Sequence, residues 1–194
     1  MSNITPNVVA YCAQECAWQY SGEMSVAHMI EGWRYAHRYR NKPIKLRDIL
    51  AMGRIVEPEQ NHRGLRRRGV QVGTSIKMDW REVPDALTHL LENQPPLESV
   101  TEAEATEFFR IFEEIHPFMD GNGRTGTLVY NWIRGSLPEP VHVPNLWDDP
   151  RRGPVKANRS ARPAGSVGWE PPKGLDYVLA RLTHDPLGDD PPIA

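Results

Sequence analysis

The sequence predicts an all-α protein, a helical bundle that carries one small β-hairpin. Apolar residues recur at helical spacing over most of the chain up to residue 138. Two of these stretches follow helix-start signals, Thr5-Pro6 and Thr101-Glu102-Ala103-Glu104. The helical pattern breaks at one short alternating run, Val70-Gln71-Val72, which lies among glycines. These observations favour packed helices with a single hairpin.

Residues 1–45 are expected to form two helices that pack on the rest of the domain. The first begins at Pro6, with Thr5 as its N-cap, and extends toward Tyr20. The second runs from about Met24 to Arg40 and has one apolar face.

The two cysteines, Cys12 and Cys16, lie one turn apart in the first of these helices. They are interpreted as reduced, partly buried thiols rather than a disulfide, as is usual for a cytosolic protein. Nothing nearby completes four zinc ligands, so a metal role for the pair is not favoured.

Residues 46–138 are expected to form the core of the domain. The predicted elements are a helix at about 46–55, an extended flap at 60–80, a helix from about 83 to 91, a helix from the Thr101 cap to about 115, and a last helix whose apolar stripe, 128–133, ends at Gly135. The loop at 116–126 therefore joins two buried helices.

The flap region is rich in arginine, with four of them within six residues at Arg63 and 66–68. Such a cluster is typical either of a solvated loop or of a nucleic-acid patch. We favour the loop, because no interleaved aromatic residues or further basic face accompany it.

Residues 139–194 are expected to be an irregular, proline-rich extension with a short helix near 175–183 and a basic tract within 148–174. The whole chain has 23 basic and 25 acidic residues, a net charge of −2, and so no global field that would gather nucleic acid or an anionic membrane. No long apolar run or basic-then-apolar leader is visible. We expect a cytoplasmic protein, with delivery into a host cell left open.

Most of the chemistry is concentrated in residues 115–126. A Gly121-Asn122-Gly123 loop that enters a helix presents backbone N–H groups at the positive helix end, an arrangement that binds phosphate. Arg124 adds a forked donor for phosphate oxygens. Asp120 is placed to hold Mg²⁺ beside bound phosphates. The unperturbed pKa of a histidine side chain lies near neutrality, so His116 is a candidate to accept a proton from an attacking hydroxyl.

Each of these features has an ordinary structural explanation when taken alone. A histidine at a helix end is commonly a cap or core residue, and a Gly-Asn-Gly run is commonly a turn. Their joint occurrence predicts group transfer from a nucleoside polyphosphate, with a phosphate cradle, a metal ligand, a charge clamp and a general base.

The run from His116 to Arg124, His-Pro-Phe-Met-Asp-Gly-Asn-Gly-Arg, resembles the signature of the Fic (Fic/Doc) family. The resemblance implies a helical Fic fold with a β-hairpin flap over the active site, and Mg²⁺-dependent transfer of AMP from ATP to a protein hydroxyl. It implies that His116 is the general base, Asp120 the metal ligand, and residues 121–124 the nucleotide-binding loop.

The flap is less similar to the family than the loop. Residues 64–72 resemble a segment that pairs with an extended target by strand addition, and the implied target-binding residues are Arg66, Val70 and Val72.

The sequence departs from the family pattern at Thr127, where the pattern has a second arginine that grips the terminal phosphates. Residues 27–32 resemble the family's inhibitory segment, whose glutamate pairs with that arginine. Because the partner is missing, Glu31 is interpreted as an exposed helix residue, with an inhibitory role as the alternative.

The leading hypothesis is an AMP transferase, toxin-like in type, that acts on a Tyr, Thr or Ser hydroxyl of a target protein. An antitoxin or another inhibitory partner is a candidate binding protein. One alternative is a Fic-fold transferase that moves another group, such as UMP, phosphocholine or a phosphate. The other is a regulatory nucleotide-binding protein with little turnover, whose basic tract engages a partner.

Overall fold

The structure, a computed structural model, describes residues 4–19 and 21–144. This part of the chain is mainly helical. The elements are α1 Pro6–Trp18, α2 Glu23–Tyr39, α3 Leu46–Val56, β1 Gln71–Val72, β2 Ser75–Ile76, α4 Val83–Glu92, α5 Glu102–Ile115 and α6 Asn122–Ile133. The predicted all-α class with a small hairpin is confirmed. The helix predicted near 175–183 and the basic tract lie outside the described residues.

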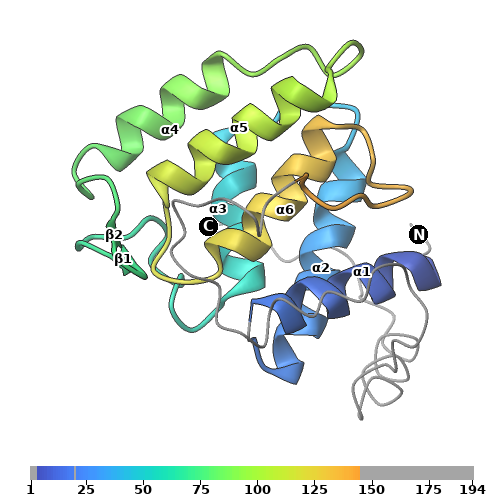
Figure 1. The fold of residues 1–194 in the computed structure, drawn as a ribbon, viewed down its shortest axis with the longest axis horizontal. Helices are drawn as coiled ribbons and strands as arrows, with labels where there is room; N and C mark the ends of the chain where they lie inside the picture. The colour runs from blue at the N-terminus through green and yellow to red at the C-terminus, as the bar shows by residue number, and fades with distance from the viewer. Residues whose placement is uncertain (1–3, 20, 145–194) are drawn as a thin grey trace.

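Helix α6 lies at the centre of the domain (Figure 1). It packs on α2, α3 and α5, while α1 packs on α2 and α4 packs on α5. Nearly every residue of α6 is buried, from Asn122 to Ile133 with Gly123 as the exception. This burial fixes the N-terminal end of α6, and the loop before it, against the rest of the core.

The two predicted helix starts are present. Thr5 Oγ1 accepts from the N–H of Val8 at 3.4 Å, and Pro6 is the first residue of α1. At α5, Thr101 and Glu104 form a capping box with distances of 3.2 and 2.8 Å. These side chains satisfy N–H groups that have no partner within the helix.

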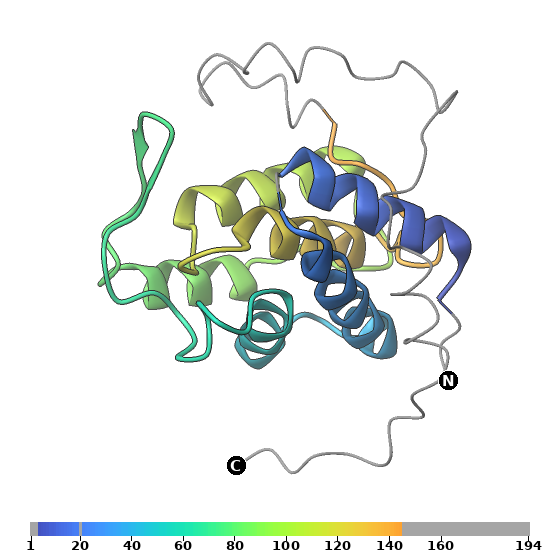
Figure 2. The same cartoon turned by 90° about the horizontal axis from the view of Figure 1, so that it is seen from below.

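The hairpin projects from one end of the helical body (Figure 2). Its antiparallel register pairs Gln71 with Ile76 and Val72 with Ser75. Gly73 supplies the positive φ, 60°, that the turn requires. Val72 and Ile76 are 47% and 82% exposed, so the flap presents apolar side chains to solvent.

None of the helices among the described residues is long and apolar enough to cross a bilayer.

The cysteines are free and fully buried, which confirms the predicted thiols. Burial raises the pKa of Cys16 to about 12 and the pKa of Cys12 well above its ordinary value. Because only a thiolate reacts readily, we expect Cys16 to react roughly a thousandfold more slowly at pH 8 in the folded protein than in denaturant, and Cys12 to be slowed as well. Stopped-flow reaction with a disulfide reagent measures the two rates. Equal rates would show that the α1 face of the core opens readily.

Candidate active site

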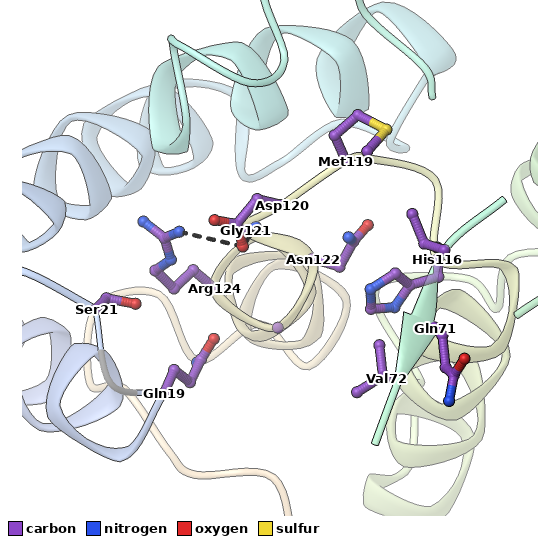
Figure 3. A pocket seen from close by; sticks show the side chains of 12 residues that line it. Gln19, Ser21, Gln71, Val72, His116, Met119, Asp120, Gly121, Asn122 and Arg124 are labelled. Atoms are coloured by element: carbon purple, nitrogen blue, oxygen red, sulfur yellow. Dashed lines mark hydrogen bonds and ion pairs between the residues drawn. The ribbon is translucent and has the colours of Figure 1, made fainter. Parts of the chain in front are cut away.

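A cavity of about 370 Å³ opens beside the start of α6. Its walls come from the flap, the loop between α5 and α6, the first turn of α6, and the turn between α1 and α2. In Figure 3 His116, Gln71 and Val72 lie on one side of the start of α6, and Arg124, Ser21 and Gln19 lie on the other. The structure thus brings His116, Asp120, Arg124 and the glycines of the loop to one place.

His116 ends α5 in the left-handed conformation, with φ 50° and ψ 64°. Left-handed backbone is costly for a residue with a Cβ, and such strain clusters at functional sites. The ring Nδ1 lies 3.8 Å from Glu113 Oε2, one turn earlier in α5, and both side chains are 12% exposed. With Nδ1 directed at a carboxylate, Nε2 is the nitrogen that can accept a proton from a group in the cavity.

The loop that follows is held closed by the side chain of Asn122. Its Oδ1 accepts from the N–H of Phe118 at 2.8 Å, and its Nδ2 donates to the carbonyl of Phe118 at 2.9 Å. The ring of Phe118 is fully buried against Gly53, where an added Cβ would lie 2.2 Å from the ring. Asn122 therefore shapes the loop with its side chain, and its backbone N–H belongs to the first turn of α6.

A second amide supports the loop from the other side. Asn61, fully buried, donates from Nδ2 to the carbonyls of Gly53 at 3.0 Å and Asp120 at 2.9 Å. Gly121 takes φ 70° beside Val56 and Glu57. The loop is thus mounted on α3 as well as on α6, which gives the rigidity that a binding site needs.

Arg124 lines the cavity but is already engaged. Its Nη2 lies 2.9 Å from Glu57 Oε2, and its Nη1 donates to the carbonyl of Val56 at 3.2 Å. The side chain is 4% exposed. Arg124 therefore links α6 to the end of α3, and a phosphate that contacts it shares the guanidinium with Glu57.

Asp120 suits a hydrated cation. Its side chain is 64% exposed at the cavity, its Oδ1 accepts from the N–H of Gly121 at 2.6 Å, and Arg124 Nη2 lies 3.9 Å away. Within residues 4–19 and 21–144, no three His, Cys, Asp or Glu side chains group together as metal ligands. A single carboxylate next to a phosphate cradle fits Mg²⁺, which takes few protein ligands and keeps several waters.

The structure places the three predicted flap residues differently. Val70 and Val72 line the cavity. Arg66, in contrast, is 2% exposed, and burial lowers the pKa of its guanidinium. It donates to the carbonyls of His116 at 2.7 Å, Arg68 at 3.0 Å, Met78 at 2.5 Å and Ile115 at 3.2 Å. Arg66 therefore anchors the base of the flap and is not available to contact a target.

Glu31, the alternative inhibitory residue, lies on α2 and pairs with Arg34 at 3.1 Å. It is not among the residues that line the cavity. The geometry agrees with its interpretation as a helix-surface residue.

Thr127 does not face the cavity. It is fully buried, donates from Oγ1 to the carbonyl of Arg124 at 2.9 Å, and contacts Tyr11 of α1.

An arginine at position 127 would bring a charge and extra volume into a packed core. We expect Thr127→Arg to destabilise the fold by about 1–3 kcal/mol in urea denaturation, with Thr127→Ser as the control. Wild-type stability with tighter ATP binding would instead mean that the new side chain reaches the cavity.

Several cavity and support residues were not predicted from the sequence. Gln19 and Ser21 line the cavity from the α1–α2 turn, and Glu57 holds Arg124. Glu113 was also missed, although its position one turn before His116 in a helix was a usable signal.

Comparison with known proteins agrees with this geometry. Residues 43–133 match the model of the Fic/DOC family, a segment that holds α3 to α6, the flap and the loop. A search of curated proteins finds no match. The family match indicates a Fic-type transferase. The signature loop, the hairpin and the helical core all lie inside the matched segment, so this chain carries a Fic/DOC family segment at residues 43–133.

Proposed function

We propose that this protein transfers AMP from Mg·ATP to a hydroxyl group of a target protein. The observation that supports the proposal is the meeting of His116, Asp120, the glycine loop and the flap at one cavity. Each of these parts supplies a different requirement of nucleotidyl transfer, and all four line the same cavity at the start of α6.

The phosphates bind at the N-terminal end of α6, where the first backbone N–H groups have no acceptor within the helix. The N–H groups of residues 122–124 and the positive end of the helix dipole stabilise the negative charge that grows on the phosphate oxygens. Asp120 would hold Mg²⁺, which would supply positive charge beside the phosphate oxygens.

His116 acts as the general base. Nε2 accepts the proton of the target hydroxyl while that oxygen forms a bond to the α-phosphorus of ATP. The bond between the α-phosphorus and the oxygen that bridges it to the β-phosphorus breaks, and pyrophosphate leaves. Glu113, 3.8 Å from Nδ1, stabilises the imidazolium that forms.

The flap delivers the target. Val70, just before β1, and Val72 of β1 line the cavity, and main-chain pairing of β1 with an extended target segment would bring a hydroxyl side chain toward His116. The target residue is a Tyr, Thr or Ser, and an antitoxin-type partner that covers the cavity would block the same approach.

Two labelled forms of ATP test the proposal. The protein is incubated with cell lysate and ATP labelled at the α-phosphate in one tube and at the γ-phosphate in another. AMP transfer predicts label on protein from the α-position alone. Label from the γ-position alone would identify phosphate transfer and would overturn the proposal. Intact-mass analysis of the modified protein then names the added group.

A second candidate, transfer of another nucleotide or group, is favoured by one observation. Arg124 is shared with Glu57, and Thr127 is buried away from the cavity, so no unshared arginine of the signature grips a terminal phosphate. Competition of unlabelled UTP, CTP and GTP against α-labelled ATP distinguishes this candidate, since a donor other than ATP would suppress labelling at a lower concentration.

A further inference from the structure

The turn between α1 and α2 brings an amide side chain over the glycine loop. Gln19 follows the last residue of α1 and lines the cavity on the side opposite the flap (Figure 3). A Cβ added to Gly123 would lie 2.5 Å from Gln19 Oε1, so the amide lies directly against the start of α6. Gln19 lies outside the matched family segment, residues 43–133.

The orientation of this amide follows from its neighbour Glu15. Gln19 Nε2 lies 3.3 Å from Glu15 Oε2, and the other oxygen of Glu15 lies 2.7 Å from Nδ1 of His142. Glu15 is fully buried and pairs with His142 across the domain. A carboxylate in such a pair only accepts hydrogen bonds, so it fixes the NH₂ of Gln19 toward itself. The carbonyl oxygen, Oε1, is then the atom that faces Gly123 and the cavity.

A carbonyl oxygen at this position selects what can bind beside it. Phosphate oxygens at neutral pH are acceptors and are repelled by Oε1, whereas a donor group is attracted. On a nucleoside polyphosphate the donors are the ribose hydroxyls and the exocyclic amine of the base. The space beside the Cα of Gly123 is therefore suited to a donor group of the nucleoside, while the backbone N–H groups of residues 122–124 stay with the phosphates.

We propose that Gln19 is a specificity-determining residue whose Oε1 accepts a hydrogen bond from a ribose hydroxyl or a base amine of the bound nucleotide. The inference rests on the proposed function, because it takes a nucleotide as the ligand of this cavity. Glu15, held by His142, is the positioning residue that sets the direction of the amide.

Calorimetric titration of the full chain with five probes, ATP and four compounds related to it, tests this. The probes are ATP, inorganic tripolyphosphate, the 2′-deoxy and 3′-deoxy forms of ATP, and purine riboside triphosphate, which lacks the 6-amine. Gln19→Leu keeps the size of the side chain and removes its acceptor. Gln60→Leu, at an exposed glutamine that does not line the cavity, is the matched control.

Gln19→Leu is expected to weaken ATP binding about tenfold, as the loss of one hydrogen bond predicts, and Gln60→Leu to leave it unchanged. Tripolyphosphate is expected to bind the wild type and Gln19→Leu equally, which also shows that the variant is folded. One of the three ATP analogues, the one that lacks the donor group, should bind the wild type about tenfold more weakly than ATP does. The same analogue should bind the wild type and Gln19→Leu with equal affinity. That analogue identifies the donor group.

Unchanged ATP affinity in Gln19→Leu would overturn the inference while leaving the proposed function standing. An equal loss for ATP and tripolyphosphate would overturn it too, because Gln19 would then act on phosphate. If another nucleoside triphosphate binds in place of ATP, the AMP proposal fails, and Gln19 is tested with that nucleotide and its deoxy forms. A wild type that binds no nucleotide would overturn both.

Discussion

Replacing His116 with asparagine is expected to lower AMP transfer by roughly 10²–10⁴-fold, the usual contribution of a general base. The target hydroxyl would keep its proton at the moment of attack, since an amide cannot accept it. Asparagine is the best-matched replacement because it tolerates the left-handed backbone that His116 adopts at φ 50°. The rate is measured as α-label incorporated into a purified target or into the protein itself.

His116→Ala serves as the companion variant. It should lose transfer to the same extent but should also lose about 1 kcal/mol of stability, because alanine takes left-handed backbone at a cost. Both variants should bind ATP like the wild type. Transfer that persists in His116→Asn would exclude this histidine as the base and would direct attention to a base supplied by the target.

Replacing Phe118 with alanine is expected to destabilise the fold by about 3–5 kcal/mol, as is typical when a buried aromatic ring is removed. The ring is fully buried, and it lies so close to Gly53 that no side chain fits between them. The cavity that alanine leaves would separate the active-site loop from α3. Urea denaturation followed by circular dichroism measures the change in the free energy of unfolding.

Phe118→Leu is the control, since it keeps most of the apolar volume and should cost less than half as much. Gly53→Ala tests the same contact from the other side, with an expected cost of about 1–3 kcal/mol from overpacking. A loss below 1 kcal/mol for Phe118→Ala would mean that the loop is held mainly by the Asn122 and Asn61 hydrogen bonds.

The helices and the loop were predictable because their signals are local. The caps at Thr5 and Thr101 and the apolar periodicity gave helix starts that agree with the structure. The concentration of chemistry in residues 115–126 predicted a site on a helix N-terminus, and the structure places His116 and residues 119–124 around one cavity. In each case the determining residues lie within about a dozen consecutive positions of the sequence.

The parts that the sequence did not predict depend on contacts between distant segments. In the sequence, Arg66 is one of four arginines in a predicted loop. In the structure it is the one of the four that is buried, and it donates to four carbonyl groups. The sequence indicates a missing phosphate ligand at Thr127, but in the fold this side chain is fully buried and contacts Tyr11 of α1. Glu57 and Gln19 carry no motif, and they reach the site through the ends of α3 and α1.

Arg66 also sets a fixed spacing between two parts of the site. One guanidinium joins the backbone of the histidine, at Ile115 and His116, to both legs of the flap, at Arg68 and Met78. If a target strand pairs with β1, as the proposed function requires, this anchor would keep that strand at a fixed distance from His116. Under the proposed function, the position of a residue along the target strand then decides whether it is modified. A shift of the target strand by two residues would bring a different side chain of the same face to His116.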